Sequence, residues 1–170
     1  PRFREKIDSA RNIWAAYLIG GSIYNDEILK SKKFRRLLLL DPDNNKAMKA
    51  IKELESERTL KDLQDNIRKL TEYAKNKDCK VKWCDDLTYS LMTIGNPPED
   101  EDMTPPDDMW VLVEAYIPGI EAEKRPSFLI ERSKQQNLSD NLLRSFKKLW
   151  KHSSPSRDER VPNKEGSQNE

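Results

Sequence analysis

One loop near the start of the chain has residue types that can bind an anion. Gly20, Gly21 and Ser22 follow an apolar run, and the segment after them has a helical composition. Backbone amides of a glycine-rich turn at the start of a helix can bind phosphate. A tight turn that needs glycine for its backbone angles is the simpler interpretation. The pattern therefore predicts either an anion site or a structural turn, and the turn is favoured.

A second loop gathers oxygen-bearing side chains at Asp41, Asp43, Asn44 and Asn45. Carboxylate and amide oxygens are ligands of hard divalent cations, so this loop could hold a metal ion. Together with Glu114, the two aspartates would supply the carboxylates of a metal-dependent enzyme that processes phosphodiesters or nucleotides. An Asp-Pro turn followed by helix-capping residues explains the same pattern and is the favoured interpretation.

Other residues with catalytic potential are few. The single histidine, His152, lies at the end of the last predicted helix, where the helix dipole favours it. The chain has no CxxC, HExxH, Walker or GxGxxG motif, which argues against a zinc site or a nucleotide-binding loop. Cys79 and Cys84 are five residues apart in a predicted strand and should lie on opposite faces. We therefore predict no catalytic residue, no metal and no cofactor.

Charged residues form two clusters. The basic cluster KSKKFRR at 30–36 could contact phosphate, but no aromatic stripe accompanies it, and a solvated helix face and strand entry is favoured. The acidic loop at 96–109 could attract cations or a basic partner, and a solvated hairpin connection is favoured. Glu114 and Arg132 interrupt apolar runs inside predicted strands. They either alternate to the solvent face or, if they point inward, need each other or a ligand.

Apolar periodicity predicts an α/β domain. Residues 12–24 predict a buried strand and a loop, and 25–32 predict a short helix. The continuous run Leu37–Leu40 is typical of a strand covered on both faces of a parallel sheet. Residues 46–76 contain neither proline nor glycine and predict helix, with a kink or a break at 55–59.

The second half of the chain predicts closely spaced strands and a closing helix. The strands are expected at 80–87, 90–95, 110–119 and 127–133. Thr59 with Asp62 gives a weak capping signal, and Ser139 is expected to cap a helix over 139–151. The order β-α-β-α-β-β-β-β-α describes a mixed sheet with a parallel start and an antiparallel continuation, flanked by helices. The domain is expected at 1–152, with a disordered C-terminal tail at 153–170.

Composition limits the classes of partner. The 31 basic and 30 acidic residues nearly cancel, so no global field favours nucleic acid or an anionic membrane. No apolar run reaches the roughly 18 residues that a membrane span requires, which predicts a cytoplasmic protein. The first residue is Pro1 and not methionine, which leaves open that a further domain lies upstream.

The order of elements and several short motifs resemble one half of a phospholipase D-like domain. The resemblance covers about residues 10–152. Within that superfamily the chain is most similar to uncharacterised prokaryotic domains, which are often joined to other domains. It rests on the strand end LLLLDP, the long helical stretch, the strands KVKWC, YSLMTIG and WVLVEAYIP, and the closing helix with F-x-x-L-W.

The resemblance implies a catalytic H-x-K-x4-D motif on TYSLMTIG, and this chain lacks it. Thr88 stands at the histidine position, Ser90 at the lysine position and Gly95 at the aspartate position. A threonine cannot accept a phosphoryl group in place of imidazole without an activating base. No histidine or lysine lies between Trp83 and Glu123, so no shift of register restores the motif.

These observations predict a degenerate, non-catalytic phospholipase D-like sensor or interaction module, a regulatory domain that could bind a phosphate-bearing ligand. The alternative is the metal-dependent enzyme using Asp41, Asp43 and Glu114. Active phospholipase D-like sites pair two halves, so a homodimer is a third expectation. The candidate ligand-binding residues are Gly20, Gly21, Ser22, Asp41, Asn44, Asn45, Thr88, Tyr89 and Ser90.

Overall fold

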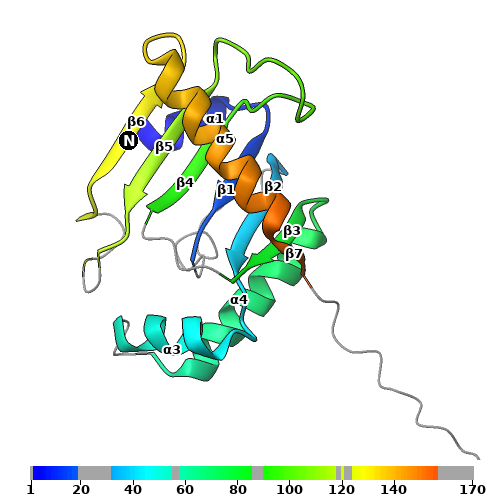
Figure 1. Cartoon of the computed structure of the whole chain (residues 1–170), viewed down its shortest axis with the longest axis vertical. Coiled ribbons are helices and arrows are strands. Elements are labelled where there is room, and N and C mark those ends of the chain that lie inside the picture. Colours follow the sequence, from blue (N-terminus) through cyan, green and yellow to red (C-terminus); the bar gives the residue numbers. More distant parts are fainter. Residues whose placement is uncertain are drawn as a thin grey trace, which may run out of the picture.

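A seven-stranded mixed sheet forms the centre of the molecule, with the strand order β6-β5-β4-β1-β2-β3-β7 (Figure 1). The computed structural model describes residues 2–18, 32–54, 58–85, 90–117, 120 and 124–156. The strands are β1 (Ile13–Ala16), β2 (Phe34–Leu40), β3 (Lys80–Cys84), β4 (Ser90–Gly95), β5 (Trp110–Ala115), β6 (Ser127–Glu131) and β7 (Ser154–Pro155). The helices are α1 (Arg2–Ser9), α3 (Asn45–Leu54), α4 (Leu60–Lys75) and α5 (Gln136–His152).

Strand pairing divides the sheet into a parallel part and an antiparallel part. Strands β1, β2 and β3 are parallel neighbours. Strand β4 pairs antiparallel with β1, and β5 and β6 continue antiparallel from it. The predicted α/β class, with a parallel start and an antiparallel continuation, is therefore confirmed. The chain crosses from β3 back to the free side of β1 before the antiparallel part begins.

Each face of the sheet has its own apolar core. Helices α1, α3 and α4 cover one face, where Ile7, Ile51 and Ile67 pack against alternate strand residues such as Leu37 and Leu39. Helix α5 covers the other face and runs across β3, β5 and β6 (Figure 1). This double covering explains the continuous run Leu37–Leu40, because a strand buried on both faces needs apolar residues at every position.

The apolar face of α5 is confirmed. Leu143, Phe146 and Trp150 are buried, and Leu142 and Leu149 pack against the same core. The Phe146 ring stacks between two indoles, with centroid distances of 5.6 Å to Trp14 and 6.0 Å to Trp150.

The two cysteines are also placed as predicted. Cys79 lies in the core under α4, and Cys84 lies in the core under α5. Neither cysteine is part of a disulfide. Burial raises the pKa of Cys79 to about 12, so this thiol stays protonated.

Helix ends partly follow the predicted signals. Thr59 and Asp62 form a complete capping box at the start of α4, and the hydrogen bonds from Thr59 lower the pKa of Asp62. Helices α3 and α4 are separate elements, and residues 55–57 between them lie outside the described ranges. The prediction that Ser139 caps α5 is wrong: the helix begins at Gln136, and the Ser139 hydroxyl donates to the Gln136 carbonyl at 2.9 Å.

Two elements were not expected from the sequence. Helix α1 precedes β1, and β7 adds two residues to the outer edge of β3. Ser153 and Ser156 are buried, so the described fold extends beyond the predicted boundary at residue 152. The predicted helix at 25–32 and the tail from 157 lie essentially outside the described ranges. Among the described residues, no helix combines the length and apolar character needed to cross a bilayer.

Candidate functional site

The sheet edge predicted to bind a ligand is formed by the carboxyl ends of β1, β2, β3 and β5 and by the amino end of β4. Strands β1, β2 and β3 are parallel and end side by side, near Tyr17, Asp41 and Asp85. Strand β4 begins at the same edge, because Ser90 pairs with Ala115 at the end of β5. Open α/β sheets usually bind ligands at such an edge, since loops from several strands meet there.

Two hydroxyl groups meet on the face of the sheet covered by α1, α3 and α4. Tyr17 directly follows β1, and Thr93 lies in β4. The Tyr17 hydroxyl and Thr93 Oγ1 are 2.5 Å apart, and either group can donate the hydrogen bond. Burial raises the pKa of Tyr17, and the nearby Glu114 carboxylate acts in the same direction. Tyr17 therefore remains a neutral phenol at physiological pH.

A carboxylate and a guanidinium lie next to this hydroxyl pair. Glu114 comes from β5, and its Oε1 is 3.6 Å from an Nη atom of Arg125, which is separated from β6 by Pro126 alone. Their side chains are only 23% and 13% exposed, so water screens the pair weakly. Desolvation raises the pKa of Glu114, while the positive charge of Arg125 opposes that shift.

Arg125 is held in place by two further contacts. Its Nε donates to the Ile120 carbonyl at 2.8 Å, and its guanidinium carbon lies 4.6 Å from the ring centroid of Tyr116. Because Tyr116 is buried, the ring forms a fixed surface beneath the guanidinium. Tyr17, Thr93, Glu114 and Arg125 thus form a polar cluster, which we call the β1-edge cluster.

The second loop, after β2, has structural partners for its polar groups. Asp41 Oδ1 accepts the backbone N–H of Asp43 at 2.8 Å, which is a local turn. Asn44 Oδ1 accepts the N–H of Ala47 at 3.1 Å and so caps α3. The favoured interpretation of this loop as a turn and a cap agrees with this geometry. Asn45 is the exposed first residue of α3.

The carboxylates proposed for a metal-dependent enzyme do not gather. Asp43 forms an ion pair with Arg68 at 2.8 Å, and Glu114 pairs with Arg125. Within the described ranges, which include Asp41, Asp43 and Glu114, no group of three His, Cys, Asp or Glu side chains is arranged to hold a metal ion. The alternative hypothesis of a metal-dependent enzyme therefore lacks the metal site that it requires of these carboxylates.

The other sequence candidates lie mostly outside the described ranges. This holds for Gly20, Gly21 and Ser22, and for Thr88 and Tyr89. Ser90 is the first residue of β4, and the structure describes its backbone but not its side chain. These five residues and the Ser90 side chain remain predictions.

Gly95 shows why the aspartate of the resembled motif has no place here. Gly95 pairs with Trp110 across β4 and β5. A Cβ atom at Gly95 would lie 2.0 Å from Trp110 Cε2, so the indole already fills the space that a side chain would need. An aspartate at this position would collide with a buried ring that is 2% exposed.

The acidic loop is tied to the fold by three arginines. Asp108 binds Arg11 at 2.8 Å, Glu101 binds Arg36 at 2.6 Å, and Asp107 binds Arg132 at 2.7 Å. Residues of the basic cluster also have partners within the chain. Lys33 Nζ donates to the Ile7 carbonyl of α1 at 3.3 Å, and Arg36 donates to Glu101 of the acidic loop. These charges therefore contribute to folding.

Glu114 and Arg132 both have partners, but they do not pair with each other. Arg132 is 6% exposed and binds Asp140 at 2.9 Å in addition to Asp107. These hydrogen bonds, first of all the one to Asp140, raise the pKa of Arg132. His152 is exposed in the last turn of α5, as predicted.

Sequence reasoning missed three members of the β1-edge cluster, namely Tyr17, Thr93 and Arg125. Each is a single polar residue in or beside an apolar segment, and an isolated residue of this kind does not form a recognisable sequence motif. Glu114 was the one member with a signal, because a charge interrupts an apolar strand there. Comparison of the chain with protein-family models, with curated proteins and with solved structures finds no match.

Proposed function

We propose that the chain is a non-catalytic sensor or interaction module, with the organisation of half a phospholipase D-like domain, that binds a phosphate-bearing ligand at the β1-edge cluster. The proposal rests on the hydrogen-bond donors of the Arg125 guanidinium. A guanidinium has five N–H donors; its Nε donates to the Ile120 carbonyl and Nη1 faces Glu114, which leaves further donors for a ligand. The contact between Nη1 and Glu114 Oε1 is a long ion pair of 3.6 Å, and Arg125 lowers the pKa of Glu114 through it.

The remaining N–H groups of Arg125 suit a phosphate. A planar guanidinium binds phosphate oxygens through two parallel hydrogen bonds, which are stronger when the donor is charged. Tyr116 and the Ile120 carbonyl already fix the position of this side chain. A ligand therefore meets a donor whose conformational entropy has largely been lost on folding.

The hydroxyl pair supplies a second recognition element. Tyr17 and Thr93 carry two hydroxyl protons, and their mutual hydrogen bond uses one of them. When Thr93 donates to Tyr17, the Tyr17 hydroxyl keeps a proton that can be donated to an ester or phosphate oxygen.

The absence of catalysis rests on the groups available in the cluster. Tyr17 has a raised pKa and is a poor nucleophile, and Glu114 is held by Arg125. Among the described residues the single histidine is exposed at the end of α5 and contacts none of the cluster. Phosphoryl transfer through a histidine therefore has no group to perform it.

Binding can be tested by calorimetric or NMR titration of the chain with inorganic phosphate and with glycerol phosphate. Arg125→Gln should weaken binding by about tenfold or more, because a charge-assisted contact contributes roughly 1.5–3 kcal/mol. Arg125→Lys should be intermediate, since it keeps the charge and loses the planar fork. Arg144→Gln, at an exposed arginine of α5, is the matched control and should bind as the wild type does.

Equal binding by wild type and Arg125→Gln, with both folded by circular dichroism, would contradict the binding site. Catalysis is tested separately with phosphodiester and phospholipid substrates, and no turnover is expected. Clear turnover that is abolished by Ser90→Ala would overturn the non-catalytic assignment.

A further inference from the structure

The strand β6 is the outermost strand on one side of the sheet. Its inner neighbour is β5, and no described strand pairs with its other side (Figure 1). At the opposite side of the sheet, β7 covers part of the outer edge of β3 through Lys82 and Trp83. Backbone groups on an uncovered edge are a template for pairing with another strand.

The hydrogen bonds to β5 show which backbone groups of β6 point outward. Pro126 accepts from Ala115 at 3.0 Å, and Arg132 donates to Met109 at 2.9 Å. Because hydrogen-bonded positions alternate along an antiparallel strand, the even-numbered residues 126–132 face β5. The N–H and C=O groups of Ser127, Leu129 and Glu131 therefore face the free edge.

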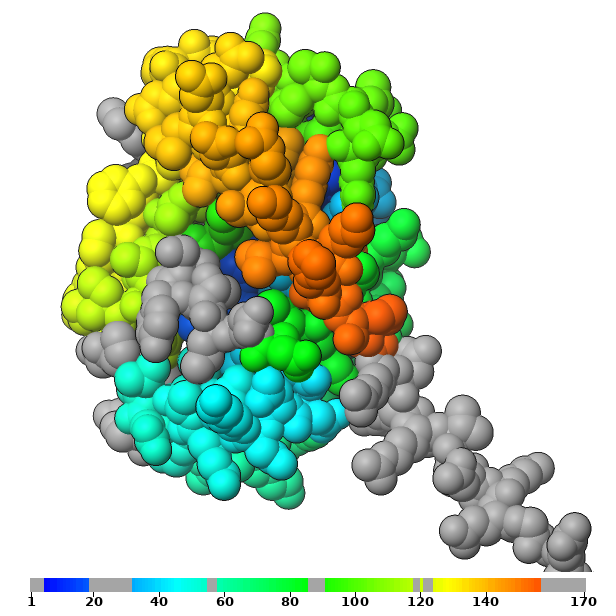
Figure 2. All heavy atoms as spheres, in the orientation of Figure 1, coloured from blue at the N-terminus to red at the C-terminus, as the bar shows by residue number. Residues whose placement is uncertain are grey.

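The side chains of this edge are apolar and open to solvent. Phe128 is 63% exposed and Leu129 is 37% exposed, and they lie on opposite faces of the sheet. Figure 2 shows the residues of this strand in yellow at one margin of the molecule. Edge strands are usually protected by lysine, by proline or by a bulge within the strand. The run Phe128–Ile130 has none of these, and its register with β5 is continuous.

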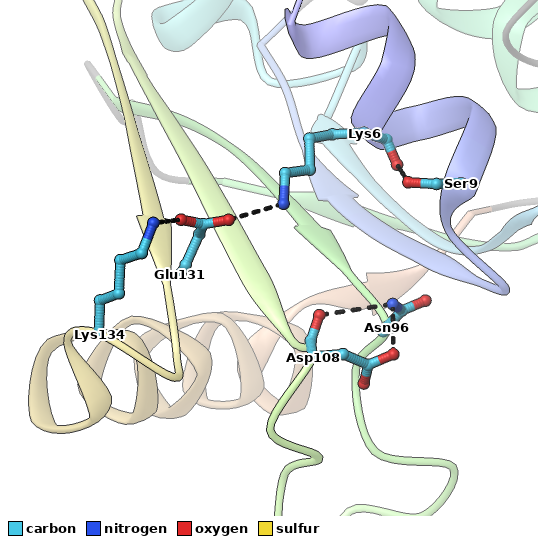
Figure 3. A network of polar contacts seen from close by, with 6 residues as sticks. All are labelled: Lys6, Ser9, Asn96, Asp108, Glu131 and Lys134. Carbon is cyan, nitrogen blue, oxygen red and sulfur yellow. Dashed lines mark hydrogen bonds and ion pairs between the residues drawn. The ribbon is translucent and has the colours of Figure 1, made fainter.

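The one charged residue of the strand is neutralised within its own chain. Glu131 accepts from Lys6 of α1 at 2.8 Å and from Lys134 at 2.5 Å (Figure 3). These hydrogen bonds, first from Lys134 and then from Lys6, lower the pKa of Glu131 to about 2. Glu131 therefore presents no unpaired negative charge to a strand that approaches the edge.

We propose that β6 pairs antiparallel with β6 of a second copy of this chain, with Leu129 opposite Leu129 across the two-fold axis. In this register Ser127 lies opposite Glu131, so all three outward-facing residues exchange backbone hydrogen bonds with their counterparts. Phe128 lies opposite Ile130 on the α5 face, and the two leucines meet on the other face. Apolar side chains then oppose apolar ones, and no two like charges are directly opposed.

The second copy is the fitting occupant because the strand is complementary to itself. Every outward backbone group finds a partner on the same three residues, and both exposed apolar residues become covered. The two sheets would join into one continuous sheet across the axis. The pairing uses Ser127, Leu129 and Glu131, none of which belongs to the β1-edge cluster, and Ser127 lies opposite its Glu114 in the sheet.

The oligomeric state is tested by sedimentation of the full chain over a concentration series. The wild type should dimerise, and Leu129→Lys should raise the dissociation constant by about tenfold or more, because two like charges would be directly opposed. Leu138→Lys is the matched control. Leu138 is 46% exposed but lies on α5, so this variant should dimerise as the wild type does. A wild type that stays monomeric, or a dimer that Leu129→Lys does not weaken, overturns the proposal.

A cross-link tests the register and does not depend on the stability of the lysine variant. Leu129→Cys should form an intermolecular disulfide on mild oxidation, because Cα atoms of a directly opposed hydrogen-bonded pair are about 5.5 Å apart. The native thiols are buried and should not compete. Leu138→Cys should cross-link far more slowly. Equal rates for the two variants would contradict pairing at Leu129.

Discussion

The hydroxyl groups of Tyr17 and Thr93 lie 2.5 Å apart and join the end of β1 to the middle of β4. Thr93 is 2% exposed, so its hydroxyl has no access to bulk water as a substitute partner. The contact connects the parallel part of the sheet with the antiparallel part. It also places two hydroxyls beside the half-buried Glu114–Arg125 pair.

Removing one of the two hydroxyls should therefore destabilise the fold. Tyr17→Phe or Thr93→Val each leaves a polar group without its partner, at a cost of roughly 1–3 kcal/mol in the free energy of unfolding. The double variant should cost less than the sum of the two, with a coupling of about 1 kcal/mol. Urea denaturation of all four proteins measures the cycle. Strict additivity would show that the hydroxyls do not interact.

Gly95 should tolerate no side chain while Trp110 keeps its position. Gly95→Ala forces a Cβ atom into the indole, and overpacking of this kind costs typically about 1–3 kcal/mol, occasionally more. Trp110→Leu makes room but loses buried area. The double variant should accordingly be more stable than the sum of the single effects predicts. Thermal denaturation checks this, and a Gly95→Ala protein as stable as the wild type would contradict it.

Arg36 should stabilise the packing of α5 and of the acidic loop. Its guanidinium carbon lies 4.1 Å from the ring centroid of Trp14 and 5.4 Å from that of Trp150, and it binds Glu101 at 2.6 Å. Arg36→Met keeps an apolar stem and removes the charge, so we expect a loss of about 1–2 kcal/mol. Arg35→Met, at its exposed neighbour, should change stability by less than about 0.5 kcal/mol. Chemical denaturation followed by tryptophan fluorescence compares the two.

Stability should fall at acidic pH through Glu131. Its pKa is lowered from 4.5 to about 2 in the folded state, so the unfolded state binds the proton first as the pH decreases. The contribution is present above the ordinary pKa and is lost as the pH falls from about 4.5 towards 2. Because the ion pairs are partly solvated, we expect about 1 kcal/mol or less.

Glu131→Gln should flatten this part of the pH profile of unfolding, and Lys6→Met should weaken it. Lys69→Met, at an exposed lysine of α4, serves as the control and should leave the profile as it is. An unchanged acid limb in Glu131→Gln would show that another group controls the transition.

Local sequence patterns determined the elements whose signal lies within a few neighbouring residues. The run Leu37–Leu40 specified a strand buried on both faces, and the spacing of Leu143, Phe146 and Trp150 specified the inner face of α5. Thr59 and Asp62 specified a helix start. Periodicity and capping act over one or two turns, so they can be recognised in the sequence alone.

Ser139 and β7 show where local signals fail. A serine can cap a helix or bond within its first turn, and the packing of α5 decided where the helix begins. Strand β7 has only two residues and exists because the edge of β3 offers hydrogen-bonding groups. A composition rich in serine and proline gave no sign of it.

The sequence by itself determined the α/β class, the absence of a complete H-x-K-x4-D motif and the opposite placement of Cys79 and Cys84. Only the tertiary structure decided that β4 lies beside β1, which brings Thr93 to Tyr17 although 76 positions separate them in the chain. It likewise decided that Glu114 pairs with Arg125 and that Phe128 lies on an open edge. The physical reason is that strand order depends on the packing free energy of the whole sheet, to which distant segments contribute together and which no local pattern records.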